Sequence, residues 1–135
     1  MKVTVFGGTG FVGRYLIDAL IKSGMYPTVL VRAGSSTWAD RPEACTTVEG
    51  DIGDDEAIAR ALQGTDAVIY NIGILREIPR LGVTFEELQE RAPKRVIDAA
   101  QALGVPRCVL MSANGVEAAS TAYQRTKLAA ERHLQ

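Results

Sequence analysis

The chain opens with the stretch that decides its fold, Met1-Lys-Val-Thr-Val-Phe-Gly-Gly-Thr-Gly-Phe-Val-Gly13. A short apolar segment, Val3–Phe6, runs into a cluster of glycines, and an amphipathic helical pattern follows over Phe11–Ser23. In a strand–turn–helix unit, glycines permit the tight turn, let the backbone approach a pyrophosphate and let the helix pack closely on the strand. The N–H groups and the positive dipole end of the helix then face the phosphates. The stretch therefore predicts a dinucleotide-binding turn.

The glycines of this stretch fit two binding spacings. Gly7, Gly10 and Gly13 give G-x-x-G-x-x-G, while Gly8, together with the second and third of these, gives G-x-G-x-x-G. The alternative is an ordinary strand-to-helix turn that contains glycine, but the strand and helix patterns on either side favour the binding turn. The residues expected to contact the dinucleotide here are Gly7, Thr9, Gly10, Phe11, Val12 and Gly13.

Length and composition restrict the class of protein. The chain has 135 residues, of which 47% are hydrophobic and 23% charged, so one globular domain over residues 1–135 is expected. A net charge of −1 gives no reason to expect nucleic acid or an anionic membrane as a partner. The two cysteines, Cys45 and Cys108, match no metal-ligand spacing, so no metal site is expected. Neither a signal sequence nor an apolar run near the ~20 residues of a membrane span is visible, which predicts a cytoplasmic protein.

Strand and helix patterns alternate along the whole chain. Continuous apolar strands that alternate with helices favour a parallel sheet covered on both faces. Right-handed crossovers then predict an α/β fold, a doubly wound sheet with strand order 3-2-1-4-5. Strands are expected at Val3–Phe6, Thr28–Val31, Thr46–Glu49, Ala67–Tyr70 and Cys108–Met111, and helices near Phe11–Ser23, Asp54–Leu62, Phe85–Leu103 and Thr121–Leu134.

Two features of the later part of the chain are unusual. Pro93 lies inside the third helical pattern, where it should kink the helix or mark its true start. The last strand, Cys108–Met111, would be a sheet edge, yet it lacks the charges and prolines that protect natural edges. The chain therefore looks like the first half of a longer fold that lacks its C-terminal part, or like one that covers this edge by forming a homo-oligomer.

The type of cofactor is indicated by Arg32, which ends the second predicted strand. An NAD site usually has Asp or Glu at this place for the ribose 2′-hydroxyl, whereas Arg accommodates a 2′-phosphate. Arg32 with the hydroxyls of Ser35 and Ser36 therefore predicts a phosphate pocket and NADP as the cofactor, with NAD as the alternative. The competing interpretation is a solvated surface arginine.

Polar residues also follow the third and fourth predicted strands. Asp51 could accept a hydrogen bond from an adenine amino group while Ile52 packs beside the ring, although Asp is equally favoured in turns for its own backbone bonds. Asn71 and Gly73 end the fourth strand next to the switch point where ligands bind, which predicts contact with the middle of the cofactor. A plain strand-ending turn is the alternative.

Candidate catalytic residues follow the fifth predicted strand. Tyr123 and Lys127 are four residues apart and share one helix face. A lysine ammonium beside a phenol favours the phenolate, so such a tyrosine can exchange a proton with a carbinol or carbonyl oxygen while a nicotinamide exchanges hydride. Ser112, directly after the strand, could hydrogen-bond the same oxygen. Such Tyr/Lys pairs are common on helix surfaces, but the position in a dinucleotide fold strengthens the prediction.

With these motifs in order, the chain resembles the short-chain dehydrogenase/reductase superfamily, in its extended and atypical branch of NAD-dependent epimerases/dehydratases and NmrA-like proteins. The stretches that carry the resemblance are similar to members related to the NADPH-binding accessory subunit of respiratory complex I. They are Gly7–Gly13, Asn71–Leu75, Met111–Gly115 and Tyr123–Glu131.

The resemblance implies a Rossmann fold and a role for each matching residue. Gly7, Gly10 and Gly13 would hold the pyrophosphate, Arg32 would favour NADP, and Asp51 would bind the adenine. Lys127 would bind the nicotinamide ribose and support Tyr123, with Ser112 as the substrate's partner.

Two departures from the family pattern leave two functions open. Many extended members have Asn or His where this chain has Gln89, which puts a full proton relay in doubt, and family members are commonly about twice as long. The first hypothesis is an NADP-preferring oxidoreductase or sugar-nucleotide epimerase that acts on an unknown small molecule. The alternative is a non-catalytic NADP(H)-binding redox sensor or an accessory or assembly subunit.

Overall fold

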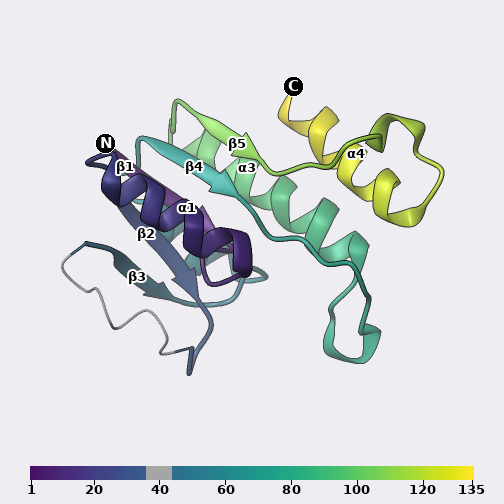
Figure 1. Cartoon of the computed structure of the whole chain (residues 1–135), viewed down its shortest axis with the longest axis horizontal. Helices are drawn as coiled ribbons and strands as arrows, with labels where there is room; N and C mark the ends of the chain where they lie inside the picture. The colour runs from purple at the N-terminus through teal and green to yellow at the C-terminus, as the bar shows by residue number, and fades with distance from the viewer. Residues whose placement is uncertain (36–43) are drawn as a thin grey trace.

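The chain folds around one parallel sheet of five strands. A computed structural model describes residues 1–35 and 44–135, so Ser36 and Trp38 lie outside the described residues. The sheet has the order β3-β2-β1-β4-β5, and every neighbouring pair of strands is parallel (Figure 1). The strands are β1 (Lys2–Phe6), β2 (Tyr26–Val31), β3 (Thr46–Glu49), β4 (Ala67–Tyr70) and β5 (Cys108–Leu110).

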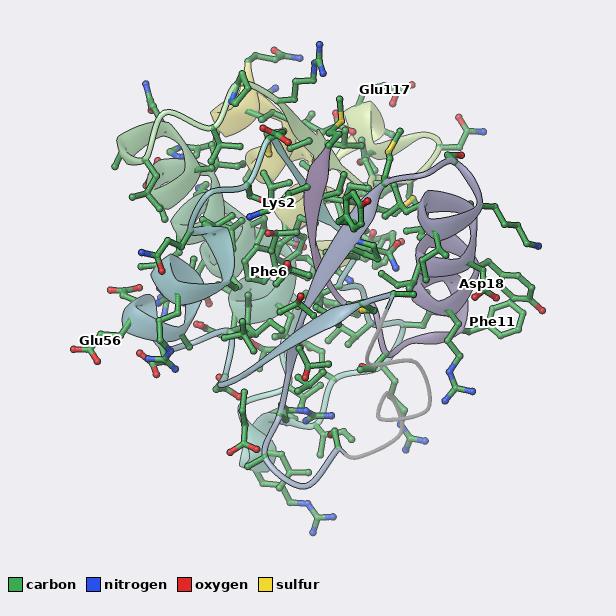
Figure 2. All side chains as sticks on the ribbon, turned by 90° about the vertical axis from the view of Figure 1, so that its left-hand side faces the viewer. Lys2, Phe6, Phe11, Asp18, Glu56 and Glu117 are labelled. Carbon is green, nitrogen blue, oxygen red and sulfur yellow. The ribbon has the colours of Figure 1, made fainter. Side chains whose placement is uncertain are left out.

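Helices cover the two faces of this sheet. The helix α1 (Phe11–Lys22) packs Ile17 against one face, in a cluster with Val3, Val5 and Val29. The helices α2 (Asp55–Leu62) and α3 (Ala92–Ala102) bury their apolar sides on the other face, and α4 (Ala122–Leu134) packs against α3. Figure 2 shows α1 and α2 on opposite sides of the strands. The predicted doubly wound fold, the strand order and the alternation of elements are therefore confirmed.

The bounds of three strands differ slightly from the prediction, and β1 begins at Lys2, one residue earlier than expected. β2 begins at Tyr26, two residues earlier than expected, because Tyr26 and Pro27 still pair with Lys2 and Val3 of β1. β5 ends at Leu110, one residue earlier than expected. Patterns of apolar residues locate a strand well, but its ends depend on how far the neighbouring strand continues the ladder.

The third helical pattern is interrupted just before its proline. A π-helical turn, Glu86–Arg91, precedes α3, and Pro93 lies in the first turn of α3, as predicted for a proline that marks a helix start. Proline has no N–H to donate, so carbonyls of the preceding turn need other partners. The phenol of Tyr70 donates to the carbonyl of Leu88 at 2.6 Å. Tyr70 is buried, and burial raises the pKa of its phenol, so the hydroxyl remains a donor.

The outer edge of the sheet is β5. Within the described residues it pairs only with β4, and Val109 remains 54% exposed. No helix in the described part of the chain is long and apolar enough to cross a membrane.

Candidate functional site

The turn between β1 and α1 is as tight as the glycine spacing predicts. Gly7 has a φ of +92°, a conformation that L side chains rarely adopt. A Cβ atom on Gly7 would lie 2.9 Å from the backbone of Asn71 and Ile72, so the turn approaches the end of β4 closely. A Cβ atom on Gly13 would lie 2.7 Å from the backbone of Gly8 and closer still to the carbonyl oxygen of Gly7. Gly7 and Gly13 are therefore needed for the fold of the turn itself.

Gly10 differs from these two glycines. It is the N-cap residue of α1, with a φ of −74° and a ψ of 175°, which other residues can adopt. A Cβ atom there would meet only the carbonyl oxygen of Gly7, at the ordinary contact distance of 3.5 Å. No side chain among the described residues caps the helix start, so its first N–H groups are left for another acceptor. Gly10 therefore keeps space open in front of a helix N-terminus.

This space belongs to a cleft of about 910 Å³ at the carboxyl ends of the strands. The cleft runs past the ends of all five strands of the described sheet, from the end of β3 to the start of α4. Of the predicted site residues that the structure describes, Ser35 and the buried Gly13 do not line it, and those that do are Gly7, Thr9, Gly10, Phe11, Val12, Arg32, Asp51, Ile52, Asn71, Gly73, Ser112, Tyr123 and Lys127. The fold thus brings together residues from most of the sequence.

One end of the cleft carries the candidates for a nucleotide. Arg32 is exposed at the end of β2, and Ser35 beside it is partly buried. The side-chain carboxylate of Asp51 accepts a hydrogen bond from the N–H of Gly53 at 2.8 Å. The backbone carbonyl of Asp51 accepts another from the N–H of Asp54. The turn chemistry considered for Asp51 is therefore present. Because Asp51 is also exposed in the cleft, one carboxylate oxygen can serve the turn while the other serves a ligand.

In the middle of the cleft, Asn71 connects the glycine turn to β4. Its backbone N–H donates to the carbonyl of Phe6 at 2.8 Å, and its side-chain amide lies 3.5 Å from the carbonyl of Gly7. Gly73 lies close to the lysine of the site, because a Cβ atom on Gly73 would be 3.8 Å from the Lys127 ammonium. Glycine at this position leaves room beside the lysine.

The far end of the cleft holds the Tyr123/Lys127 pair. α4 begins with a capping box in which Thr121 and Gln124 satisfy each other's backbone N–H groups, and this fixes the first turn that carries Tyr123. The Tyr123 ring makes an edge contact with Phe85, and the Lys127 ammonium lies 5.7 Å from the centre of the Tyr123 ring. The pair is therefore adjacent and shares the cleft, as the four-residue spacing predicts.

Lys127 is only 6% exposed and donates to the carbonyl of Met111 at 2.9 Å. Burial lowers its pKa from the usual range of lysine, and the nearby carboxylate of Glu131 opposes that shift. The hydrogen bond to Met111 holds the ammonium at the end of β5, on the cleft side of α4.

Ser112 is the third candidate catalytic residue of the site. Ser112 lines the cleft, but its Oγ atom is buried and has no hydrogen-bond partner among the described residues. It lines a small inner pocket together with Gln89 and Lys127. The Gln89 side chain is buried there as well, donates to the carbonyl of Ile74 at 2.7 Å, and leaves its Oε1 atom without a partner in the described structure. Sequence reasoning treated Gln89 only as a departure from the family pattern.

One wall of the cleft was not predicted. The segment 74–85, between β4 and the π-helical turn, contributes five residues to the lining. The signal for it was the mixture of apolar residues, Pro79 and Gly82 between a strand and a helix, which a turn alone does not require. The five residues are Ile74, Leu75, Leu81, Gly82 and Val83.

Comparison with known proteins agrees with this geometry. The model of a family described as NAD(P)H-binding matches residues 7–135. The chain is 30% identical to a ceramide reductase from Caulobacter vibrioides over 129 residues, which is 96% of this chain and 40% of that protein. It is 34% identical to a 3-beta-hydroxysteroid dehydrogenase from Mycolicibacterium neoaurum over 122 residues, which is 85% of this chain and 32% of that protein. The chain thus spans less than half the length of these relatives.

Solved structures show the same fold. A putative NAD-dependent epimerase/dehydratase from Bacillus halodurans matches 99% of this chain with a TM-score of 0.86 at 22% identity, over 64% of its own length. A short-chain dehydrogenase/reductase superfamily protein from Agrobacterium tumefaciens with bound NAD matches 99% of this chain with a TM-score of 0.81 at 24% identity, over 44% of its own length. The chain therefore belongs to the NAD(P)H-binding family and has the Rossmann-type fold of the short-chain dehydrogenase/reductase superfamily.

Proposed function

We propose that the chain binds NADP(H) in the cleft and provides the dinucleotide-binding and proton-transfer residues of an oxidoreductase. The observation that carries the proposal is that one cleft contains both an open helix N-terminus at Gly10 and the adjacent pair Tyr123/Lys127. Family membership supports the dinucleotide, and the reductase and dehydrogenase named among the relatives support redox chemistry.

The residues fit a dinucleotide in a defined order. The space that a Cβ atom on Gly10 would fill suits the pyrophosphate, which would accept hydrogen bonds from the first N–H groups of α1. Arg32 would bind a 2′-phosphate through charge-assisted hydrogen bonds, and Asp51 with Ile52 would hold the adenine. Asn71 and Gly73 would lie beside the middle of the cofactor, and Lys127 would reach the nicotinamide ribose.

A bound nicotinamide would supply or accept hydride, and the protein's own groups would handle the proton. The Tyr123 phenol would donate a proton to a carbonyl oxygen in reduction, or accept one from a carbinol in oxidation. The ammonium of Lys127, which lies 5.7 Å from the centre of the Tyr123 ring, would keep a positive charge beside the reacting groups. Ser112 would hydrogen-bond the same oxygen only where its hydroxyl becomes accessible to the ligand, since its Oγ atom is buried. A sugar-nucleotide epimerase would use the same groups.

A second candidate is a non-catalytic module that senses NADP(H) or assembles with other subunits. The observation that favours it is that the Ser112 hydroxyl is buried without a hydrogen-bond partner among the described residues, together with Gln89 in place of the family's Asn or His. Such a module would keep the glycine turn and Arg32 but would not need Tyr123.

We also propose that the chain associates with itself. Val109 of β5 is exposed, and among the described residues the outer edge of that strand pairs with no other strand, so the two form an apolar surface of the kind that promotes association.

Two experiments separate the main candidates. NADPH and NADH are titrated into the protein by calorimetry, and then NADPH oxidation is followed with simple ketones, for the unmutated chain and for Tyr123→Phe. The oxidoreductase predicts tighter NADPH binding, turnover, and loss of turnover with retained NADPH binding in Tyr123→Phe. NADPH binding without turnover favours the non-catalytic module, and no binding of either dinucleotide refutes both.

A further inference from the structure

We propose that the segment 74–85 is a preformed apolar wall of the substrate site, and that the site takes carbonyl or carbinol compounds with an extended apolar body. This inference rests on the proposed function, because it assigns the substrate class of the same cleft. Leu75 and Leu81 are the residues that would determine this specificity.

The wall has its own internal structure. Ile78 and Val83 form an antiparallel bridge, with the Ile78 N–H donating to the Val83 carbonyl at 2.7 Å and the Val83 N–H donating to the Ile78 carbonyl at 3.3 Å. The connection is the short helical turn Pro79–Leu81, which Gly82 ends with a φ of +70°. In Figure 1 this teal segment projects beyond the strand ends, between β4 and α3. Leu81 is thus held in place by backbone bonds within the hairpin.

Hydrogen bonds hold both ends of the segment 74–85 in place. At the N-terminal end of the segment, the buried side-chain amide of Gln89 donates to the backbone carbonyl of Ile74 at 2.7 Å. At the C-terminal end of the segment, the backbone N–H of Phe85 donates to the carboxylate of Glu77 at 2.8 Å. Phe85 in turn contacts the ring of Tyr123. The wall therefore has a fixed position relative to the candidate catalytic tyrosine.

The chemistry of the cleft differs between its two ends. Arg32 and Asp51 line the end that would hold the adenine ribose. In the described part of the chain, the hairpin contributes only uncharged residues to the lining. Leu75 is 90% exposed and Leu81 67% exposed, and Met111 across the cleft is also exposed. Large apolar side chains left open to water in a pocket are typical of a binding site for apolar groups.

These observations favour a bound substrate as the group that covers the exposed leucines. The exposed leucines line the same cleft as Tyr123 and Lys127, beside which a reacting carbonyl would lie. The hairpin also keeps its own hydrogen bonds without any covering segment. Burying each methylene group of a ligand on such a wall raises affinity by about fourfold, which corresponds to ~0.8 kcal/mol.

The test is a homologous series of methyl ketones, from 2-butanone to 2-decanone, titrated by calorimetry into the protein in the presence and absence of saturating NADP⁺. The variants are Leu81→Ser and Leu75→Ser, and the matched control is Leu103→Ser. Leu103 is a leucine that is 53% exposed at the end of α3 and does not line the cleft. We expect affinity to rise about fourfold per methylene over the middle of the series. Each hairpin variant should weaken 2-decanone at least tenfold and leave 2-butanone unchanged, and Leu103→Ser should change neither.

Three results would overturn the inference. The first is affinity that does not depend on chain length. The second is a length dependence that the hairpin variants do not alter. The third is a lowered unfolding midpoint for Leu81→Ser with an unchanged ketone series, which would mean that Leu81 packs against protein. Failure of the proposed function is seen separately, as absent NADPH binding or absent turnover, because ketone binding to the wall is measured with and without the dinucleotide.

Discussion

Exchanging Gly13 and Gly10 for alanine should separate the glycine that the fold needs from the glycine that the ligand needs. In Gly13→Ala the new methyl group would lie 2.7 Å from the backbone of Gly8, whereas ordinary contacts between carbon atoms are about 3.5–4.0 Å. The overlap of nearly 1 Å is with the backbone of Gly7 and Gly8, which cannot move away like a flexible side chain. In Gly10→Ala the methyl group would have ordinary contacts only.

The expected magnitudes differ accordingly. Overpacking of a tight contact costs about 1–3 kcal/mol or more, and the better helix propensity of alanine returns at most ~1 kcal/mol. Gly13→Ala should therefore lower the free energy of unfolding by about 2 kcal/mol and the unfolding midpoint by roughly 6–10 °C. Gly10→Ala should change the free energy of unfolding by less than about 0.5 kcal/mol, because its backbone conformation suits alanine. It should weaken dinucleotide binding at least tenfold, which is about 1.4 kcal/mol, and Gly10→Val should abolish binding.

The assays are thermal and urea unfolding followed by circular dichroism, and calorimetric titration with NADPH. The two alanine variants serve as controls for each other, since each makes the same chemical change in the same turn. The reasoning would be refuted if Gly13→Ala unfolded at the same midpoint as the unmutated protein. It would also be refuted if Gly10→Ala bound NADPH with undiminished affinity while remaining folded.

Three further predictions concern charge and association. Arg32 should make NADPH bind more tightly than NADH by about 1.5–3 kcal/mol, and Arg32→Asp should remove or reverse this preference; equal affinities of the unmutated protein, measured by calorimetry, would contradict the assignment. Burial lowers the pKa of Lys127, so the unfolded chain binds this proton more readily than the folded one, and the contribution of Lys127 to stability should increase as the pH rises toward the ordinary lysine pKa near 10.4. Urea unfolding from about pH 7 to 10 measures this contribution as the free energy of unfolding of the unmutated protein minus that of Lys127→Met. This difference should increase with pH, and a difference that is constant with pH would contradict the prediction. The exposed edge at β5 should produce a dimer or larger oligomer by light scattering at micromolar concentration, and Val109→Lys should shift it toward monomer; a monomer before mutation would show that the edge does not associate.

Much of the fold was determined by the sequence alone. The glycine turn of residues 7–13, the alternation of apolar strands with amphipathic helices, and Pro93 at a helix start are local signals, because each depends on residues a few positions apart. Once the strands are parallel, right-handed crossovers leave few strand orders, and the order 3-2-1-4-5 follows. That order brings the strand ends together, which is why the predicted residues line one cleft. Their functional roles and the preference for NADP stay predictions.

Other features were decided only by tertiary structure. The sequence places Ser112 next to the site, but only packing decides that its hydroxyl is buried and that Ser112, Gln89 and Lys127 line one inner pocket. The hairpin wall depends on a bridge between Ile78 and Val83 and on the hydrogen bond from Gln89 to the start of the segment, and neither leaves a periodic pattern. Side-chain direction and loop position depend on contacts between segments far apart in the chain. Local propensity has no access to those contacts, so it could predict which residues gather at this site but not which way each of them points.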